Sequence, residues 1–298
     1  MPSLGARSFT LILRLIGRNR NLASSEALAK SIADARRRGP ALPTARMRRA
    51  LRISEESFDG HRVYTLRPAA DVAGCRHVLY LHGGAFVRPI TGYHWHFLQH
   101  LVQTSGCTVM APLYPLAPEY SGLAALEFVL KVHDRVVQAV APEALVVMGD
   151  SAGGNLALAM TLALRDRNQL LPHRLVLIAP VADVALTHPD IAAIEPLDPM
   201  LIPRGLQEAG RLYAGQLPLD HPYISPLHAD LSGLPPMAVY AGTHDVLYPD
   251  ILALADKARC QGNDVELVIG PEMIHVWPLL PFAEGRAARN DIAARLLI

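Results

Sequence analysis

The 298-residue sequence has little of what marks disulfide-rich, membrane-spanning or nucleic-acid-binding proteins. Its three cysteines are widely spaced and form no C-x-x-C motif, which excludes a disulfide framework and indicates reduced thiols in a cytoplasmic compartment. No apolar run reaches the length of a membrane span. The run from Phe9 to Leu13 is interrupted by Arg14, and no convincing signal-peptide cleavage site follows. The net charge of +1 gives no signal for nucleic acid. We therefore expect a cytoplasmic protein that does not bind nucleic acid.

Charged residues are also few at 18%, whereas hydrophobic residues make up 51% of the chain. This length and composition suit one large domain with a sizeable core. Nearly continuous apolar segments alternate with helical segments, which is typical of a mostly parallel sheet covered by helices on both faces. We predict an α/β fold on this pattern. The expected strands cover residues 62–66, 78–81, 108–111, 145–148, 175–178, 237–241 and 265–269. The expected helices cover residues 95–104, 124–140, 156–167, 251–261 and 283–297.

Two segments fall outside this alternation. Residues 1–52 have a helical pattern with a break at Gly39-Pro40. Residues 182–223 lie between two expected strands and contain several prolines and a short helix. An insertion there would lie over the carboxyl ends of the strands, where α/β active sites form. We expect 1–52 and 182–223 to lie outside the core. The core then comprises 53–181 and 224–298.

The motif Gly149-Asp150-Ser151-Ala152-Gly153 has the context of a nucleophile elbow, with an apolar strand before it and a helix after it. Its small glycines let the chain turn sharply, so that the serine hydroxyl projects above the sheet. The amide of Ala152 would lie at a helix N-terminus, where unpaired N–H groups attract negative charge. Ser151 is therefore the predicted nucleophile.

A glycine-rich loop, His82-Gly83-Gly84-Ala85-Phe86, follows the strand at 78–81. Acyl transfer requires preorganised N–H donors for the oxyanion of its transition state. We predict that the amides of Gly83 and Gly84 supply this oxyanion hole together with Ala152. No phosphate-binding motif follows the loop. His82 is expected to anchor the loop, and Ala85 is expected to keep an ordinary backbone because alanine disfavours positive φ.

Asp245 and His275 each follow a late apolar strand, which places them at the same edge of the sheet as Ser151. The chain order Ser, Asp, His is that of α/β-hydrolases. We predict that His275 is the general base and that Asp245 orients it. Asp250 is the rival acid, but it follows a proline and suits a helix start. His244 is a weaker base candidate because its use would leave Asp245 without a partner.

Three further histidines, His94, His96 and His100, raise the question of a metal site. His96 and His100 have the i, i+4 spacing of two ligands on one helix face. No glutamate accompanies them as in H-E-x-x-H. We expect a plain helix beside the glycine-rich loop, with neither a metal nor an organic cofactor.

These motifs together resemble the hormone-sensitive lipase family of α/β-hydrolases. That family pairs a His-Gly-Gly-Gly loop with Gly-Asp-Ser-Ala-Gly-Gly, and the segments 113–119, 222–227 and 234–236 resemble its other landmarks. The resemblance runs from about residue 60 to the C-terminus and implies an α/β-hydrolase fold with a helical cap formed by 1–52 and 182–223. Two departures affect the pocket rather than the triad. Ala85 replaces the third glycine, and Pro115 replaces an arginine and removes one salt bridge.

We therefore predict a serine carboxylic-ester hydrolase that cleaves short- to medium-chain acyl esters through an acyl-enzyme. The alternatives are a lipase or a lactone hydrolase, then an amidase or peptidase, then a non-catalytic small-molecule-binding protein on the same fold. The candidate pocket residues are Phe86, Met200, Leu201, Tyr213 and Trp277.

The N-terminal segment concentrates the positive charge. Residues 1–52 contain twelve of the 28 basic residues and two of the 27 acidic ones, so they carry +10 and the remainder −9. One interpretation is a cap docked on an acidic core. The other is peripheral contact with anionic lipid, because Leu11, Ile12, Leu15 and Ile16 form a stripe beside Arg14. The oligomeric state stays open, with a homodimer through an edge strand as one arrangement.

Overall fold

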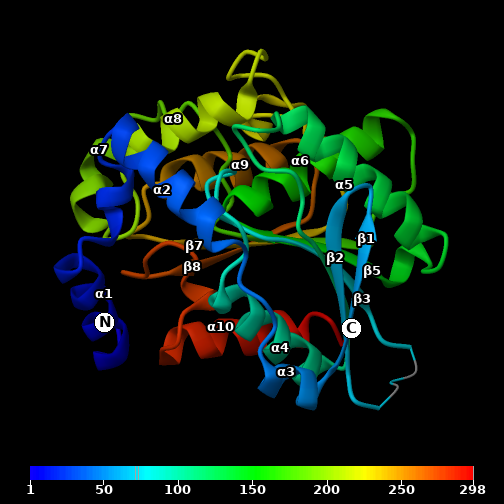
Figure 1. The fold of residues 1–298 in the computed structure, drawn as a ribbon. Helices are drawn as coiled ribbons and strands as arrows, with labels where there is room; N and C mark the ends of the chain where they lie inside the picture. The colour runs from blue at the N-terminus through cyan, green and yellow to red at the C-terminus, as the bar shows by residue number, and fades with distance from the viewer. Residues whose placement is uncertain (71, 73, 298) are drawn as a thin grey trace.

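A single eight-stranded sheet forms the centre of the molecule (Figure 1). The computed structural model describes residues 1–70, 72 and 74–297. The strand order is β1-β2-β4-β3-β5-β6-β7-β8, and pairing is antiparallel between β1, β2 and β4 but parallel from β4 to β8. The strands are β1 Arg52–Phe58, β2 His61–Arg67, β3 His77–Leu81, β4 Thr108–Pro112, β5 Leu145–Asp150, β6 Arg174–Ile178, β7 Met237–Gly242 and β8 Val265–Gly270. The predicted mostly parallel sheet is confirmed.

The first strand was not predicted. β1 is an edge strand whose residues are largely exposed, so it has no apolar pattern to indicate it. It pairs with β2 through a two-residue turn at Asp59-Gly60, where both residues have positive φ. Asp-Gly between two strands is a typical type I′ hairpin signal, and it is the signal that would have located β1.

Helices cover both faces of the sheet (Figure 1). α4 and α10 pack together on one face, and α5, α6 and α9 lie on the other. The helices are α1 Leu4–Leu15, α2 Ser25–Arg38, α3 Ala45–Ala50, α4 Gly92–Ser105, α5 Gly122–Val137, α6 Ala152–Asp166, α7 Ile191–Ile194, α8 Pro203–Ala214, α9 Tyr248–Cys260 and α10 Ala283–Ala294. The short 3₁₀ turns are η1 Arg18–Leu22, η2 Pro142–Ala144, η3 Glu195–Leu197, η4 Pro226–His228 and η5 Trp277–Leu279.

The N-terminal segment and the segment inserted after β6 lie against each other. α8 contacts both α2 and η1, and Figure 1 shows α2, α7 and α8 gathered on one side of the sheet. α1 lies apart from them and is fastened to α10, where Phe9 packs edge-on against Phe282 at 5.8 Å and the Ser3 hydroxyl donates to Glu284 at 2.8 Å. The inserted segment thus packs directly against the N-terminal segment through α8.

Candidate active site

Ser151 occupies a sharp turn between β5 and α6, with φ 54° and ψ −122°. Two glycines make this turn feasible. A Cβ at Gly149 would lie 2.3 Å from the carbonyl oxygen of Gly153, and a Cβ at Gly153 would lie 2.0 Å from that of Leu81. Any other residue at either position would push β5, β3 and α6 apart. The strained serine is therefore held by close backbone packing.

A buried hydrogen-bond chain joins the three residues that the sequence singled out. His275 Nε2 lies 2.9 Å from Ser151 Oγ, and His275 Nδ1 lies 2.7 Å from Asp245 Oδ2. The other oxygen of Asp245 accepts the backbone N–H of Leu247 at 2.9 Å. Because a carboxylate can only accept, the imidazole carries its proton on Nδ1. Its Nε2 is then free to accept the Ser151 hydroxyl proton.

Backbone bonds between two loops bring the acid and the base together. Thr243 N–H donates to Gly270 at 3.1 Å, and His244 N–H donates to Met273 at 2.9 Å. These hydrogen bonds hold the loop after β7 against the loop after β8. The rival acid Asp250 lies instead in the first turn of α9, as predicted for a helix start.

Electrostatics favour the charged form of the candidate base. Burial disfavours the imidazolium of His275, but the charge and hydrogen bond of Asp245 and the charges of Asp198 and Asp150 outweigh it and raise the pKa of His275. A raised pKa makes this imidazole a stronger base toward the Ser151 hydroxyl.

The glycine-rich loop differs from expectation in two respects. Ala85 has φ 53°, so the expectation of an ordinary backbone there is wrong. The loop turns tightly, because Val87 and Arg88 both donate their N–H groups to the carbonyl of Gly84, and this turn requires positive φ at Ala85. Gly83 N–H already donates to the buried Asp150 carboxylate at 2.9 Å, at odds with its predicted role.

Three other amides are free to donate a hydrogen bond to a ligand oxygen. Within residues 1–70, 72 and 74–297, no protein acceptor is found for the N–H groups of Gly84, Ala85 and Ala152. Ala152 begins α6, so its N–H also lies at the positive end of that helix.

Asp150 organises this region, a role that the sequence analysis missed. Its carboxylate accepts the Gly83 N–H, the Tyr80 hydroxyl and, at 3.2 Å, His94 Nε2. Burial opposes its ionisation, but these partners overcome it and lower the pKa of Asp150. The orientation of His94 is fixed because its Nδ1 accepts the N–H of Thr91 at 2.9 Å. The available signal was the Thr91–His94 spacing at a helix start, which is a capping box.

His82 anchors the same loop. Its ring stacks on Tyr114 with centroids 4.5 Å apart, and the Tyr114 hydroxyl donates to the His82 carbonyl. Burial and the neighbouring His94 lower the pKa of His82 to about 4, so its ring is neutral at pH 7. His82 thus serves the loop in the way the sequence indicated.

The candidate pocket residues separate into two places. Phe86 stacks on Tyr213 of α8, with centroids 3.8 Å apart. Leu201 is buried and Met200 half-buried in the inserted segment. Trp277 instead packs near Gly270 and edge-on to Tyr240, whose hydroxyl bonds to α10.

The segment 113–119, which contains Pro115, is held by hydrogen bonds from α2 in the N-terminal segment. Arg36 of α2 forms a bidentate pair with Glu119 at 2.8–2.9 Å. The same guanidinium donates to the carbonyls of Val87 at 2.7 Å and Ala117 at 2.8 Å. The N-terminal segment thereby supports the glycine-rich loop.

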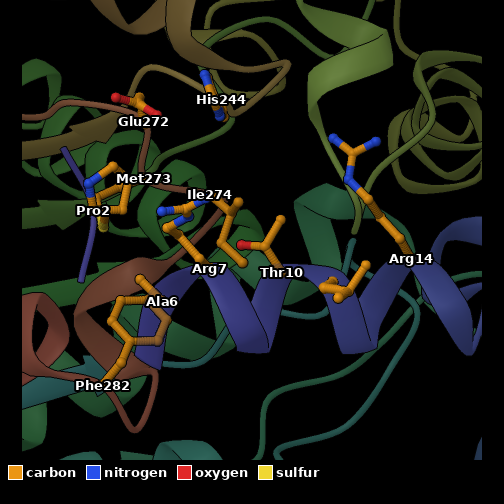
Figure 2. Close-up of a pocket in the computed structure, with 11 residues that line it drawn as sticks. Pro2, Ala6, Arg7, Thr10, Arg14, His244, Glu272, Met273, Ile274 and Phe282 are labelled. Atoms are coloured by element: carbon orange, nitrogen blue, oxygen red, sulfur yellow. The ribbon is translucent and has the colours of Figure 1, made fainter. Parts of the chain in front are cut away.

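A pocket of about 270 Å³ lies between α1 and the loops that carry Asp245 and His275. Figure 2 shows Arg7, Thr10 and Arg14 on the side of α1 that faces His244 and Ile274. No cluster of three or more residues able to hold a metal occurs in the described part of the chain. Its helices also include none long and apolar enough to cross a membrane.

Comparison with known proteins identifies the family. A model of the alpha/beta hydrolase fold matches residues 78–279. This chain belongs to the α/β-hydrolase family. An acetyl-hydrolase of Streptomyces hygroscopicus is 35% identical over 218 residues, which is 72% of each chain. An esterase of Acinetobacter venetianus is 31% identical over 75% of each chain. A triacylglycerol lipase of Mycobacterium tuberculosis is 32% identical over 76% of this chain but only 47% of its own length.

Solved structures agree with these relatives. An esterase/lipase from an uncultured bacterium is 27% identical with a TM-score of 0.85, covering 99% of this chain and 98% of its own. A hormone-sensitive lipase from a metagenome library is 26% identical with a TM-score of 0.83, covering 98% and 97%. This α/β-hydrolase is therefore a hormone-sensitive lipase-like carboxylesterase or lipase, and it hydrolyses ester bonds.

Proposed function

We propose that this hydrolase cleaves short- to medium-chain acyl esters through a covalent acyl-enzyme on Ser151. The hydrogen-bond chain from Ser151 through His275 to Asp245, at 2.9 and 2.7 Å, carries the proposal. Ser151 Oγ attacks the ester carbonyl as its proton passes to His275 Nε2. His275 then protonates the departing alkoxide, and water repeats the cycle on the acyl-enzyme. Asp245 holds the imidazole tautomer and stabilises the imidazolium.

The oxyanion is bound, in this proposal, by the amides of Gly84, Ala85 and Ala152. Gly83 is left out because its N–H donates to Asp150. Its role becomes structural, since that bond fixes the start of the loop that presents the next two amides. Donors that are already oriented before reaction stabilise the transition state without reorganisation.

One ring contact and the names of the relatives support the proposed acyl length. The Phe86–Tyr213 stack fills space beside the glycine-rich loop and favours small acyl groups. The names acetyl-hydrolase and esterase among the relatives support the same choice. The relative named triacylglycerol lipase keeps a lipase as the second candidate, ahead of a lactone hydrolase.

We also propose that α1 attaches the enzyme to anionic lipid. Leu11, Ile12 and Leu15 of α1 and Ile16 at its C-terminal end are 53–74% exposed. Residues 1–22 contain basic side chains but no acidic one. An exposed apolar face with basic neighbours is the surface of an interfacial helix.

Labelling with a fluorophosphonate tests the proposed chemistry. The reagent should modify the wild-type enzyme stoichiometrically at Ser151, and Ser151→Ala should remain unlabelled while keeping its fold. Tight ligand binding without labelling would instead favour a non-catalytic binding protein. Faster cleavage of aminoacyl-nitroanilides than of matched esters would favour an amidase.

A further inference from the structure

Asp198 is a buried carboxylate beside the proposed triad and takes no part in the proposed proton transfers. It lies in the inserted segment between η3 and α8, and it is 2% exposed. Its Oδ1 accepts the N–H groups of Met200 at 2.7 Å and Leu201 at 3.0 Å. Its Oδ2 accepts the N–H of Val246 at 3.0 Å. A single carboxylate thus ties the inserted segment to the backbone immediately after Asp245.

The charge of Asp198 acts on the catalytic base. Asp245 and Asp198 both favour the imidazolium of His275, and Asp150 adds a weaker effect. In return, burial and the charge of Asp245 raise the pKa of Asp198, whereas the charge of His275 and the bonded amides oppose the rise. Two carboxylates around one histidine tolerate each other best when that histidine is protonated.

No cationic side chain forms an ion pair with Asp198 in the described part of the chain. Arg14 of α1 contacts the residue before Asp198, but its guanidinium donates to the carbonyl of Leu197 at 2.9 Å and not to the Asp198 carboxylate. The partners of the Asp198 carboxylate are backbone amides only. No ion pair neutralises the negative charge of Asp198, and this charge therefore acts on His275.

We propose that Asp198 is a positioning residue for ester hydrolysis: it ties the inserted segment to the Asp245 loop and stabilises the imidazolium that His275 forms. This inference rests on the proposed role of His275 as general base. It also couples the pocket to the chemistry, because the carboxylate that bonds to Val246 holds Met200 and Leu201 as well.

The test compares Asp198→Asn with a matched variant, Asp183→Asn. Asp183 is equally buried in the same segment, where it accepts the Ala185 N–H at 2.8 Å and the Ser225 hydroxyl at 3.1 Å. The pH profile of kcat/KM and the Tm are measured for both. We expect Asp198→Asn to move the acid limb down by about 0.5 pH unit or more and to lower kcat about tenfold, since the imidazolium loses one stabilising charge. Asp183→Asn should lower Tm and leave the acid limb in place.

Two more variants keep the test decisive. Asp198→Glu retains the charge and should keep the acid limb near its wild-type position. If Asp198→Asn does not fold, Asp198→Ser replaces it, because a serine hydroxyl can accept the local N–H of Met200 without a charge. A folded neutral variant with the wild-type acid limb and kcat would overturn the inference. The proposed mechanism fails separately, through turnover that survives in Ser151→Ala.

Discussion

Ala85 follows the two glycines of the glycine-rich loop, and its backbone is strained. Its φ of 53° and that of Phe86, 63°, lie in the left-handed region, as does that of Ser151. Each costs about 1–2 kcal/mol in a residue with a Cβ. The cost is borne at the residues that would surround the oxyanion, so local strain and preorganisation coincide there.

Substitution of Ala85 tests whether its amide belongs to the oxyanion hole. Glycine accepts this φ freely, so Ala85→Gly should keep kcat/KM within about threefold and Tm within a few degrees. Valine is β-branched and strongly disfavours positive φ. Ala85→Val should therefore reorient the amide and lower kcat/KM about 100-fold.

Thermal unfolding and initial rates on one short ester measure both variants. Equal activity of the glycine and valine variants would remove Ala85 from the proposed oxyanion hole.

The raised pKa of His275 sets the expected pH dependence. The base must be neutral to accept the Ser151 proton, so kcat/KM should fall as pH falls through the His275 pKa, with a midpoint above that of an ordinary imidazole. Asp245→Asn removes the charge that raises this pKa. It should shift the midpoint down and reduce kcat by about 10⁴-fold.

A pH–rate profile checks the sign of this shift. His244→Gln is the matched control, because His244 neighbours Asp245 but makes no side-chain bond to Ser151 or His275 in the described chain. A midpoint that rises in Asp245→Asn would contradict the assigned role of this carboxylate.

At the scale of elements, the close contact between α8 and η1 holds the two outer segments together. Gly205 of α8 packs so tightly that a Cβ there would lie 2.3 Å from the backbone oxygen of Leu22. We expect Gly205→Ala to push the segments apart and cost about 1–3 kcal/mol of stability. KM should rise, because both segments flank the proposed pocket.

Gly92→Ala is the matched control for this prediction. Gly92 is also helical, at the start of α4, and a Cβ added there would meet no atom within 4 Å. This control should keep or raise Tm. Thermal unfolding and Michaelis–Menten kinetics measure both variants. An unchanged Tm and KM in Gly205→Ala would contradict the prediction, because the backbone around Leu22 would then move aside at no cost.

The sequence predicted elements better than their interactions. The strands from β3 to β8 were found because each is a short apolar run, whereas β1 was missed because an exposed edge needs no such run. Ser151, Asp245 and His275 were recognisable by motif and chain order. The bonds of Asp150 to Gly83 and of Asp198 to Val246 were not, since they join residues 67 and 48 positions apart.

At the scale of the whole molecule, the exposed face of α1 predicts attachment to anionic bilayers. Full-length enzyme should float with phosphatidylglycerol-containing vesicles at low salt and less at high salt. Leu11→Ser with Leu15→Ser should abolish flotation. Leu170→Ser alters a leucine that is similarly exposed, at 57%, and should float like wild type. Full-length enzyme that stays unbound at low salt would contradict the attachment.

The central claim is Ser151-dependent hydrolysis of short acyl esters. The most direct test measures initial rates on p-nitrophenyl esters from acetate to palmitate, with Ser151→Ala as the blank. We predict rates that peak at short acyl chains and disappear in the blank. Rates that rise toward palmitate would contradict the proposed acyl length and favour a lipase, and equal rates in the blank would contradict the mechanism itself.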